Sequence, residues 1–375
     1  MLTIPSMPFY WRFKDSAASA PGEPPARVPF VFEFDERLDL VIEQRSPRLE
    51  ALLADIYSRN TNVGYLQDGH SLIGGYGEDF WRFLSGLLAS HPAQDVVEIG
   101  CGGCVLLDRL RGQGRNVLGV DPSPFAAQAG ARKGIQVLQE YFPPRSLPMR
   151  PGLIFQMDVL EHVPDPLAFL RAQAECLADA GLIVVNVPDC GLSIGRGDIS
   201  MALHQHVNMF DETSLRRTLE ASGLEVVTIE KSRYGAALFG AARRSDGHRP
   251  APAAGRSRWE RFEQQAGRNI ESFWKHLDAA RGRRESLGFY MPQRAFPYLG
   301  IRDSFEGFRA FDNMNVWHGR YLDGLPVPIE NHADLLARPV DHVFVMSLTF
   351  GNSVRDQLRR ELPRTRVTTL DEIIG

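Results

Sequence analysis

The fold is decided by one stretch of the sequence, VVEIGCGGC at residues 96–104. The apolar run that ends at residue 99 is typical of a buried strand. Glycines beyond it allow a sharp backbone turn into a helix, whose first N–H groups point toward an approaching ligand. Asp121 ends the next apolar run, where a carboxylate can accept hydrogen bonds from both hydroxyls of a ribose. Gly100, Gly102 and Asp121 therefore predict a site for a nucleoside-containing cofactor.

The chain around this turn alternates short apolar runs with amphipathic helices. Strands are predicted over 95–99, 116–120, 135–139, 152–157, 181–187, 224–230 and 235–242. Helices are predicted near 103–112, 123–132, 165–178 and 212–222. Apolar runs this short, separated by helices, are what a parallel sheet covered on both faces requires. The pattern predicts a doubly wound α/β sheet that a late hairpin closes.

The flanking regions differ in composition from this core. Residues 1–30 are rich in Pro, Ala and Ser and are predicted to be irregular, and apolar residues between Leu38 and Ile56 predict a helix. After a polar break, the last ninety or so residues return to the α/β alternation. The predicted domains are an N-terminal arm, helix and possible lid (1–78), the α/β core (79–243), a linker and helix (244–285) and a smaller C-terminal α/β domain (286–375). In that last domain we expect strands at SLGFYM, GFRAFDN and DHVFVMS, a helix at NSVRDQLRREL and a short run at RVTTL.

Composition excludes several classes of protein. The 375 residues are 43% hydrophobic and 23% charged, as in an ordinary globular protein. A net charge of −4 gives no electrostatic footprint for nucleic acid or an anionic membrane. No run approaches the roughly 18 apolar residues of a membrane span. Four cysteines, without a signal-like N-terminus, favour a cytoplasmic location.

The glycine turn distinguishes between cofactors. The third glycine of the dinucleotide pattern G-x-G-x-x-G is replaced by Val105. An acid, Glu98, lies two residues before Gly100. This arrangement resembles motif I of class I S-adenosylmethionine (SAM) methyltransferases, E/D-x-G-x-G-x-G, except that Cys104 replaces its last glycine.

Three later segments strengthen the resemblance. They are VLEHVPDP (159–166), VVNVP (184–188) and HVNMFDETSL (206–215) followed by ASGL (221–224). Each is similar to a segment that the family carries at the same place along its sheet. The resemblance implies a Rossmann-like class I methyltransferase sheet, SAM as the cofactor and methyl transfer as the reaction.

The C-terminal region resembles a narrower group. FDN (311–313), HGRYLDG (318–324), VPI (327–329) and DHVFV (341–345) are similar to the C-terminal Rossmann-like domain of sugar C-methyltransferases, which act on nucleotide-linked deoxysugars. Two departures stand against this. No cysteine precedes Cys101, so the N-terminal zinc module of that group is absent. Its Tyr-His-Glu-His catalytic run is here Leu203-His204-Gln205-His206, which leaves carbon or oxygen as the methylated atom.

Histidines are the candidate bases, because an ordinary pKa near 6.5 suits proton removal at neutral pH. They are His162, His204 and His206, all predicted at the carboxyl rim of the sheet. For each of them a purely structural hydrogen bond is the alternative role. The resemblance implies that Asp158 contacts the methionine part of SAM; the alternative is a carboxylate that only starts a helix. It also implies that a segment with Tyr65, His70 and Tyr76 folds over the cofactor as a lid; the alternative is surface packing.

A metal site is not expected. Cys101, Cys104, Cys176 and Cys190 could be written as a zinc set. However, the first two lie inside the cofactor turn, where a metal ion would occlude the cofactor.

The predicted function is SAM-dependent methyl transfer to a small-molecule acceptor, a sugar, nucleotide-sugar or natural product, with no nucleic acid or membrane partner. One alternative is an NAD-dependent sugar-nucleotide oxidoreductase or epimerase, although no Tyr-x-x-x-Lys pair follows Tyr141, Tyr234 or Tyr290. Another is a non-catalytic subunit that binds SAM or a sugar nucleotide. The acceptor and the oligomeric state are left open by the sequence.

Overall fold

The computed structural model describes residues 1–9, 11–18, 23–58, 71–233, 235–245 and 256–375. The chain folds into two compact units. One, the seven-stranded unit, consists of residues 34–190 and 205–255. The other, the five-stranded unit, consists of residues 1–33, 191–204 and 256–375. The predicted domain boundaries at 78, 243 and 285 remain predictions.

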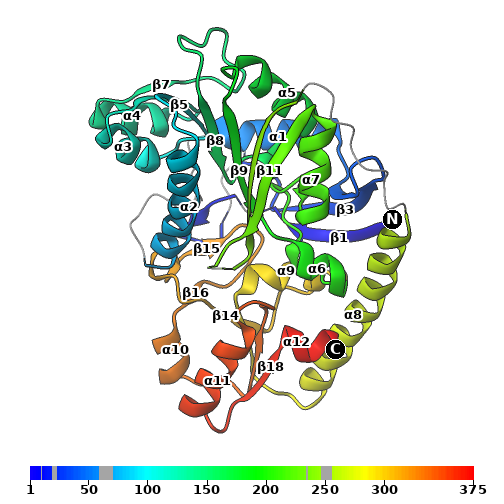
Figure 1. Ribbon diagram of the computed structural model, residues 1–375. Coiled ribbons are helices and arrows are strands. Elements are labelled where there is room, and N and C mark those ends of the chain that lie inside the picture. Colours follow the sequence, from blue (N-terminus) through cyan, green and yellow to red (C-terminus); the bar gives the residue numbers. More distant parts are fainter. Residues whose placement is uncertain (10, 19–22, 59–70, 234, 246–255) are drawn as a thin grey trace. The chain divides into compact units, whose positions relative to one another are not determined.

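The seven-stranded unit is built on a mixed, mainly parallel sheet (Figure 1). Its strand order is β11-β12-β9-β8-β5-β6-β7. The strands are β5 (Asp95–Ile99), β6 (Asn116–Val120), β7 (Gln136–Leu138), β8 (Leu153–Met157), β9 (Leu182–Pro188), β11 (Leu224–Lys231) and β12 (Ala237–Arg244). β7, β6, β5, β8 and β9 are parallel, whereas β12 runs antiparallel to both β9 and β11. The predicted α/β class and the late hairpin are confirmed.

Helices cover both faces of this sheet. The helices of the unit are α1 (Pro47–Ser58), α2 (Ser71–Ser90), α3 (Val105–Gly112), α4 (Pro124–Lys133), α5 (Pro166–Cys176) and α7 (Glu212–Ala221). Val96 packs in one core with side chains of α2, α3 and α4, and its neighbour Val97 packs in a second core with side chains of α5 and α7. Successive strand residues therefore enter opposite cores, which is why the central strands β5, β8 and β9 are mostly apolar on both faces.

Capping residues on both sides set the start and the end of helix α4. The Ser123 side chain accepts a hydrogen bond from the Ala126 N–H, and Pro124 occupies the first helical position. Gly134, at a φ of 67°, ends the helix in the left-handed conformation. The helix therefore starts three residues after Asp121 and fixes the backbone beside that carboxylate.

The N-terminal region differs from the prediction. Residues 1–30 were expected to be irregular, but they contain β1 (Leu2–Pro8), β2 (Phe13–Lys14) and the start of β3 (Arg27–Asp35), with β1 antiparallel to β3. The predicted helix from residue 38 begins only at Pro47, because proline has no N–H to donate to an interior helical bond and is tolerated only in the first turn. Before it, β4 (Leu40–Glu43) pairs with β10 (Asn208–Met209).

The five-stranded unit contains a wholly parallel sheet of order β16-β14-β13-β17-β18. Its strands are β13 (Leu287–Tyr290), β14 (Phe308–Phe311), β16 (Ile329–Glu330), β17 (His342–Val345) and β18 (Arg366–Thr369). Its helices are α6 (Gly191–Arg196), α8 (Ser257–Gly282), α9 (Phe296–Gly300), α10 (His332–Ala337), α11 (Gly351–Glu361) and α12 (Leu370–Ile374). In chain order the strands read 3-2-1-4-5, the order of a doubly wound sheet whose direction reverses between β13 and β17. The predicted C-terminal α/β fold is confirmed.

Minor elements complete the chain. β15 (Tyr321–Leu322) pairs with β2, and single 3-10 turns lie at Leu160–His162, Ile199–Met201, Pro292–Arg294 and Asn315–Trp317. Within the described part of the chain, no helix combines the length and the apolarity that crossing a membrane requires.

Candidate active site

The turn between β5 and α3 adopts the left-handed conformation at three residues. Gly100, Gly102 and Cys104 have φ values of 72°, 44° and 54°. A Cβ atom at Gly100 would lie 2.5 Å from the Val159 Cγ2 atom, so this position accepts only glycine. The glycines of the predicted motif are thus required by the backbone, and the turn brings the ends of β5 and β8 together.

Asp121 joins this turn to the next strand. Its Oδ2 accepts the Gly102 N–H at 2.9 Å, and its Oδ1 accepts the Ser123 N–H at 2.8 Å. Burial raises the pKa of Asp121, and the two N–H donors act in the opposite direction. Each carboxylate oxygen keeps a second lone pair beyond these bonds. The carboxylate is therefore fixed beside the glycine turn and can still accept hydrogen bonds from a ribose.

Glu98 lies beneath the turn. Only 3% of it is exposed, and its carboxylate accepts a hydrogen bond from the Leu107 N–H of α3. Burial raises its pKa well above the ordinary value. These contacts indicate that Glu98 supports the strand-to-helix connection from inside.

Asp158 and Tyr76 form a second polar group at the same edge of the sheet. Asp158 follows β8 directly, with a φ of 54°, and accepts a hydrogen bond from the Tyr76 hydroxyl at 2.6 Å. The Asn186 side chain, at the end of β9, donates to the same hydroxyl at 2.9 Å. Burial raises the pKa of Asp158 to about 6, against the effect of the bond from Tyr76. Asp158 and Tyr76, predicted separately as residues of the cofactor site, are thus in contact, whereas Tyr65 and His70 lie outside the described residues.

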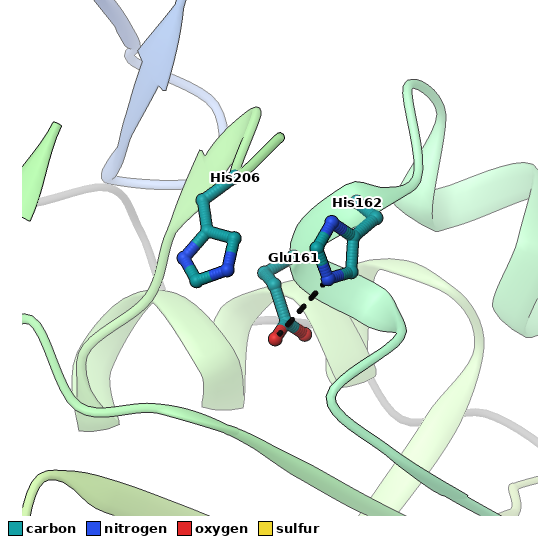
Figure 2. A group of neighbouring side chains, drawn as sticks. All are labelled: Glu161, His162 and His206. Carbon is teal, nitrogen blue, oxygen red and sulfur yellow. Dashed lines mark ion pairs between the residues drawn. The ribbon is translucent and has the colours of Figure 1, made fainter. Parts of the chain in front are cut away.

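The imidazole of His162 is held in one orientation. It lies in the 3-10 turn after β8, and its Nδ1 is 2.6 Å from the Gln205 carbonyl oxygen and 3.1 Å from the Tyr57 hydroxyl. Burial lowers the pKa of His162 to about 4, so the ring is neutral at pH 7. A neutral ring whose Nδ1–H donates to a carbonyl has its lone pair on Nε2. That atom lies 3.8 Å from an oxygen of Glu161 (Figure 2).

His206 lies beside this pair. Its ring centroid is 4.9 Å from that of His162, with the planes at 81° (Figure 2). Asn208, two residues on, donates to the carbonyl oxygens of Leu160 at 3.1 Å and Val163 at 2.7 Å. These two hydrogen bonds therefore hold the segment that contains His206 against the 3-10 turn that contains His162.

His204 has a different environment. It is buried in the five-stranded unit, with its Nε2 3.1 Å from the Val28 carbonyl oxygen. The rings of Phe9 and Phe30 pack against it at 5.2 and 5.5 Å. Burial lowers its pKa to about 4. These contacts fit the alternative role of His204, which is a purely structural hydrogen bond. His204 does not belong to the cluster that His162 and His206 form.

Four contributors to the site were not singled out from the sequence: Tyr57, Glu161, Asn186 and Asn208. Glu161 stands next to His162, and Asn208 belongs to the segment that begins at His206, so both lay within stretches that carried the resemblance. Asn186 likewise belongs to VVNVP (184–188), whereas no local signal marks Tyr57, whose contact joins parts of the chain that are far apart.

The cysteines of the turn pack inside the seven-stranded unit. Cys101 and Cys104 are buried, with sulfur atoms 3.8 Å apart. A Cβ at Gly119 would meet the Cys101 sulfur at 2.5 Å, so this thiol fills the space above a glycine of β6. None of the four cysteines is in a disulfide in the described part of the chain.

Comparison with known proteins shows what this region is similar to. Residues 64–229 match the sequence model of a methyltransferase domain. The ubiquinone biosynthesis O-methyltransferase of Cupriavidus pinatubonensis is 27% identical over 165 residues, which cover 39% of this chain and 66% of that protein. The enzyme of the same name from Xylella fastidiosa is 28% identical over 159 residues, covering 37% and 64%. The chain thus spans just under two thirds of the length of these relatives.

Solved structures are similar at lower identity. A 1,6-didemethyltoxoflavin-N1-methyltransferase from Burkholderia thailandensis is 20% identical, with a TM-score of 0.40 over 55% of this chain and 96% of that one. A SAM-dependent methyltransferase from Clostridium acetobutylicum is 11% identical, with a TM-score of 0.37 over 45% and 92%.

Proposed function

We propose that this chain is a class I SAM-dependent methyltransferase, which transfers a methyl group from SAM to a small-molecule acceptor; the match of residues 64–229 to a methyltransferase domain supports this. The observation that carries this proposal is the bond from the Gly102 N–H to Asp121, which sets a fixed carboxylate beside an open glycine turn. An acid placed there suits a ribose, and the missing third glycine argues against a dinucleotide.

The proposed cofactor site has two parts. Gly100, Gly102 and Asp121 would bind the nucleoside, with Glu98 supporting the turn from within. Asp158, held by the Tyr76 hydroxyl, would bind the methionine ammonium, because a buried carboxylate pairs favourably with a cation. SAM supplies an electrophilic methyl group on a sulfonium centre; the chain's own task is to hold the acceptor in line with it.

Removal of the acceptor proton is assigned to the group of Glu161, His162 and His206. In the neutral ring of His162 the Nε2 atom has the lone pair that receives a proton, and Glu161 is close enough to stabilise the resulting cation. His206 adds a second imidazole at the same place. His204 is left out of this assignment because its contacts hold it in a core.

For the acceptor we propose a hydroxylated small molecule, with a sugar or nucleotide-sugar as the first class to examine. The similarity of the C-terminal region to sugar methyltransferases supports that class. The names of the relatives favour oxygen over carbon as the methylated atom. Four cysteines without a disulfide agree with the proposed cytoplasmic location.

Calorimetric titration of the full chain with SAM, and in parallel with NAD, tests the proposal. We expect SAM to bind with one site and NAD not to bind. Incubation with SAM and a panel of nucleotide-sugars and hydroxylated metabolites is then expected to release S-adenosylhomocysteine. Binding of NAD without SAM would overturn the assignment, and SAM binding without turnover on any acceptor would favour a non-catalytic subunit.

A further inference from the structure

Three potential metal ligands converge at the edge of the seven-stranded sheet. Glu161 and His162 belong to the 3-10 turn after β8, and His206 lies on the segment before β10 (Figure 2). One ligand atom from each residue lies within 4.8 Å of the other two. Among the residues that the structure describes, this is the one such group of three.

The carboxylate of Glu161 is buried without compensation. Only 1% of the residue is exposed, and apart from its own backbone N–H its side-chain oxygens have no hydrogen-bond partner in the described part of the chain. The distance of 3.8 Å to the Nε2 of His162 is too long for a hydrogen bond. Burying an uncompensated carboxylate is costly, so a proton or a cation must accompany it.

The orientation of His162 directs an electron pair at this carboxylate. Its Nδ1–H is directed at the Gln205 carbonyl oxygen at 2.6 Å, which is the second-sphere bond that metal-binding histidines typically make. The Nε2 lone pair then faces the carboxylate of Glu161. Two electron-pair donors thus point at one another with a space between them, which an electrophile would fill.

We propose that Glu161, His162 and His206 bind a divalent transition-metal ion of the Zn²⁺ type. Two imidazoles and one carboxylate are a common zinc donor set, and three protein ligands leave a fourth position for water or an acceptor oxygen. Ligands about 2.0–2.2 Å from one ion lie roughly 3.3–3.6 Å apart in tetrahedral geometry. The 4.8 Å cluster reaches these distances by small side-chain rotations.

The use of this ion in catalysis rests on the proposed function. An acceptor hydroxyl in the fourth position would release its proton to water at a lower pH than it does in solution. Its oxygen would then form a bond to the methyl carbon, while the carbon–sulfur bond breaks and leaves its electron pair on sulfur. The ion keeps its oxidation state. With the ion bound, the Nε2 of His162 acts as a ligand, so the base role proposed above applies to the ion-free site only.

Titration of the chelator-treated full chain with ZnCl₂, in competition with a chromogenic zinc chelator, tests the site. We expect one ion per chain, with at least a hundredfold weaker binding in Glu161→Gln and in His206→Gln. His91→Gln, which removes an exposed histidine of the same unit, is expected to keep the affinity of the unmodified chain. Co²⁺ in the same site should give the visible absorption of a four- or five-coordinate ion.

Three outcomes separate the claims. Absence of stoichiometric Zn²⁺ binding, or equal affinity in Glu161→Gln, overturns the metal site. Thermal melting of the same samples shows whether each variant is folded, and His206→Gln carries the test if Glu161→Gln fails to fold. Zinc binding in a chain that does not bind SAM would keep the metal site and reject the proposed function.

Discussion

The two sheets of this chain share a winding order but differ at the turn that follows their first strand. In both, an acid comes directly after the second strand in the sequence: Asp121 after β6 and Asp312 after β14. In both, a left-handed residue follows the first strand closely, Gly100 in one sheet and Met291 in the other. Only the seven-stranded sheet has the glycines that expose backbone N–H groups at this point. A doubly wound sheet therefore creates a position at which a nucleoside can bind. The turn after its first strand determines whether that position is accessible.

The two aspartates that follow the second strands differ in their hydrogen-bond partners. Asp121 accepts a backbone N–H from the first turn, Gly102, at 2.9 Å. Asp312 accepts one from Met314, in its own loop, at 3.0 Å. At the end of β13 the fully buried Tyr290 donates its hydroxyl hydrogen bond to Asn313, so a large side chain stands near the position where the other sheet has an open glycine turn.

Of the substitutions that test this comparison, Gly100→Ala is expected to have the largest effect. A left-handed alanine costs about 1–2 kcal/mol, and the contact with Val159 adds a similar amount. We expect a loss of about 2–4 kcal/mol of stability and no SAM binding, measured by thermal melting and calorimetry. Gly103→Ala is the matched control, since its Cβ would meet its nearest neighbour at 3.7 Å without positive φ. Equal melting of the two variants would contradict the account.

A smaller, pH-dependent effect is expected from Asp158→Asn. The folded protein holds a proton on Asp158 up to a pKa of about 6, whereas an unfolded aspartate loses it near pH 4. Stability contributed by the protonated group is therefore present below pH 4 and is lost as the pH rises to 6. Asparagine tolerates the left-handed backbone and does not ionise. We expect the variant to match the unmodified protein at pH 4 and to exceed it by about 1–2 kcal/mol at pH 8.

The control for this effect lies in the other sheet. Burial also raises the pKa of Asp312 to about 6, so Asp312→Asn should show the same pH dependence. Melting temperatures from pH 4 to pH 8 measure both variants. A stabilisation by Asp158→Asn that is equal at pH 4 and pH 8 would exclude the titration of this carboxyl as its cause.

The smallest effects concern ion pairs on the two sheets. Arg309 binds Glu330 through two bonds of 2.7 and 2.6 Å, with side chains 25% and 15% exposed. Arg243 binds Glu225 through bonds of 3.1 and 2.8 Å on an open surface. We expect Arg309→Met to cost about 1–2 kcal/mol, because it removes two charge-assisted hydrogen bonds from a partly buried carboxylate and leaves only the bond from Arg338 at 2.8 Å. Arg243→Met should leave the melting temperature unchanged. A reversed order would show that burial does not control these pairs.

The sequence predicted those features that depend on nearby residues. The strands of the seven-stranded sheet follow from short apolar runs, and the turn and Asp121 follow from a glycine pattern and a strand end. The N-terminal strands could not be predicted in this way, because β1 is defined by its pairing with β3 and its segment is interrupted by Pro5 and Pro8.

The histidines show the same limit within the site. His204 and His206 are two residues apart, which in an extended strand would place them on one face. A turn at residues 204 and 205 separates them, so His204 packs between phenylalanine rings and His206 approaches His162. Glu161 was overlooked because its importance comes from burial without a partner, which the sequence does not reveal.

The most direct test of the central claim is the SAM affinity of Asp121→Asn compared with that of Asp312→Asn, measured by calorimetry. Loss of a charged acceptor for ribose hydroxyls is worth about 1.5–3 kcal/mol, or roughly 10- to 150-fold in affinity. We predict this loss for Asp121→Asn and an unchanged dissociation constant for Asp312→Asn. Unchanged binding by Asp121→Asn, or an equal loss in both variants, would contradict the assignment of the nucleoside to the glycine turn of the seven-stranded sheet.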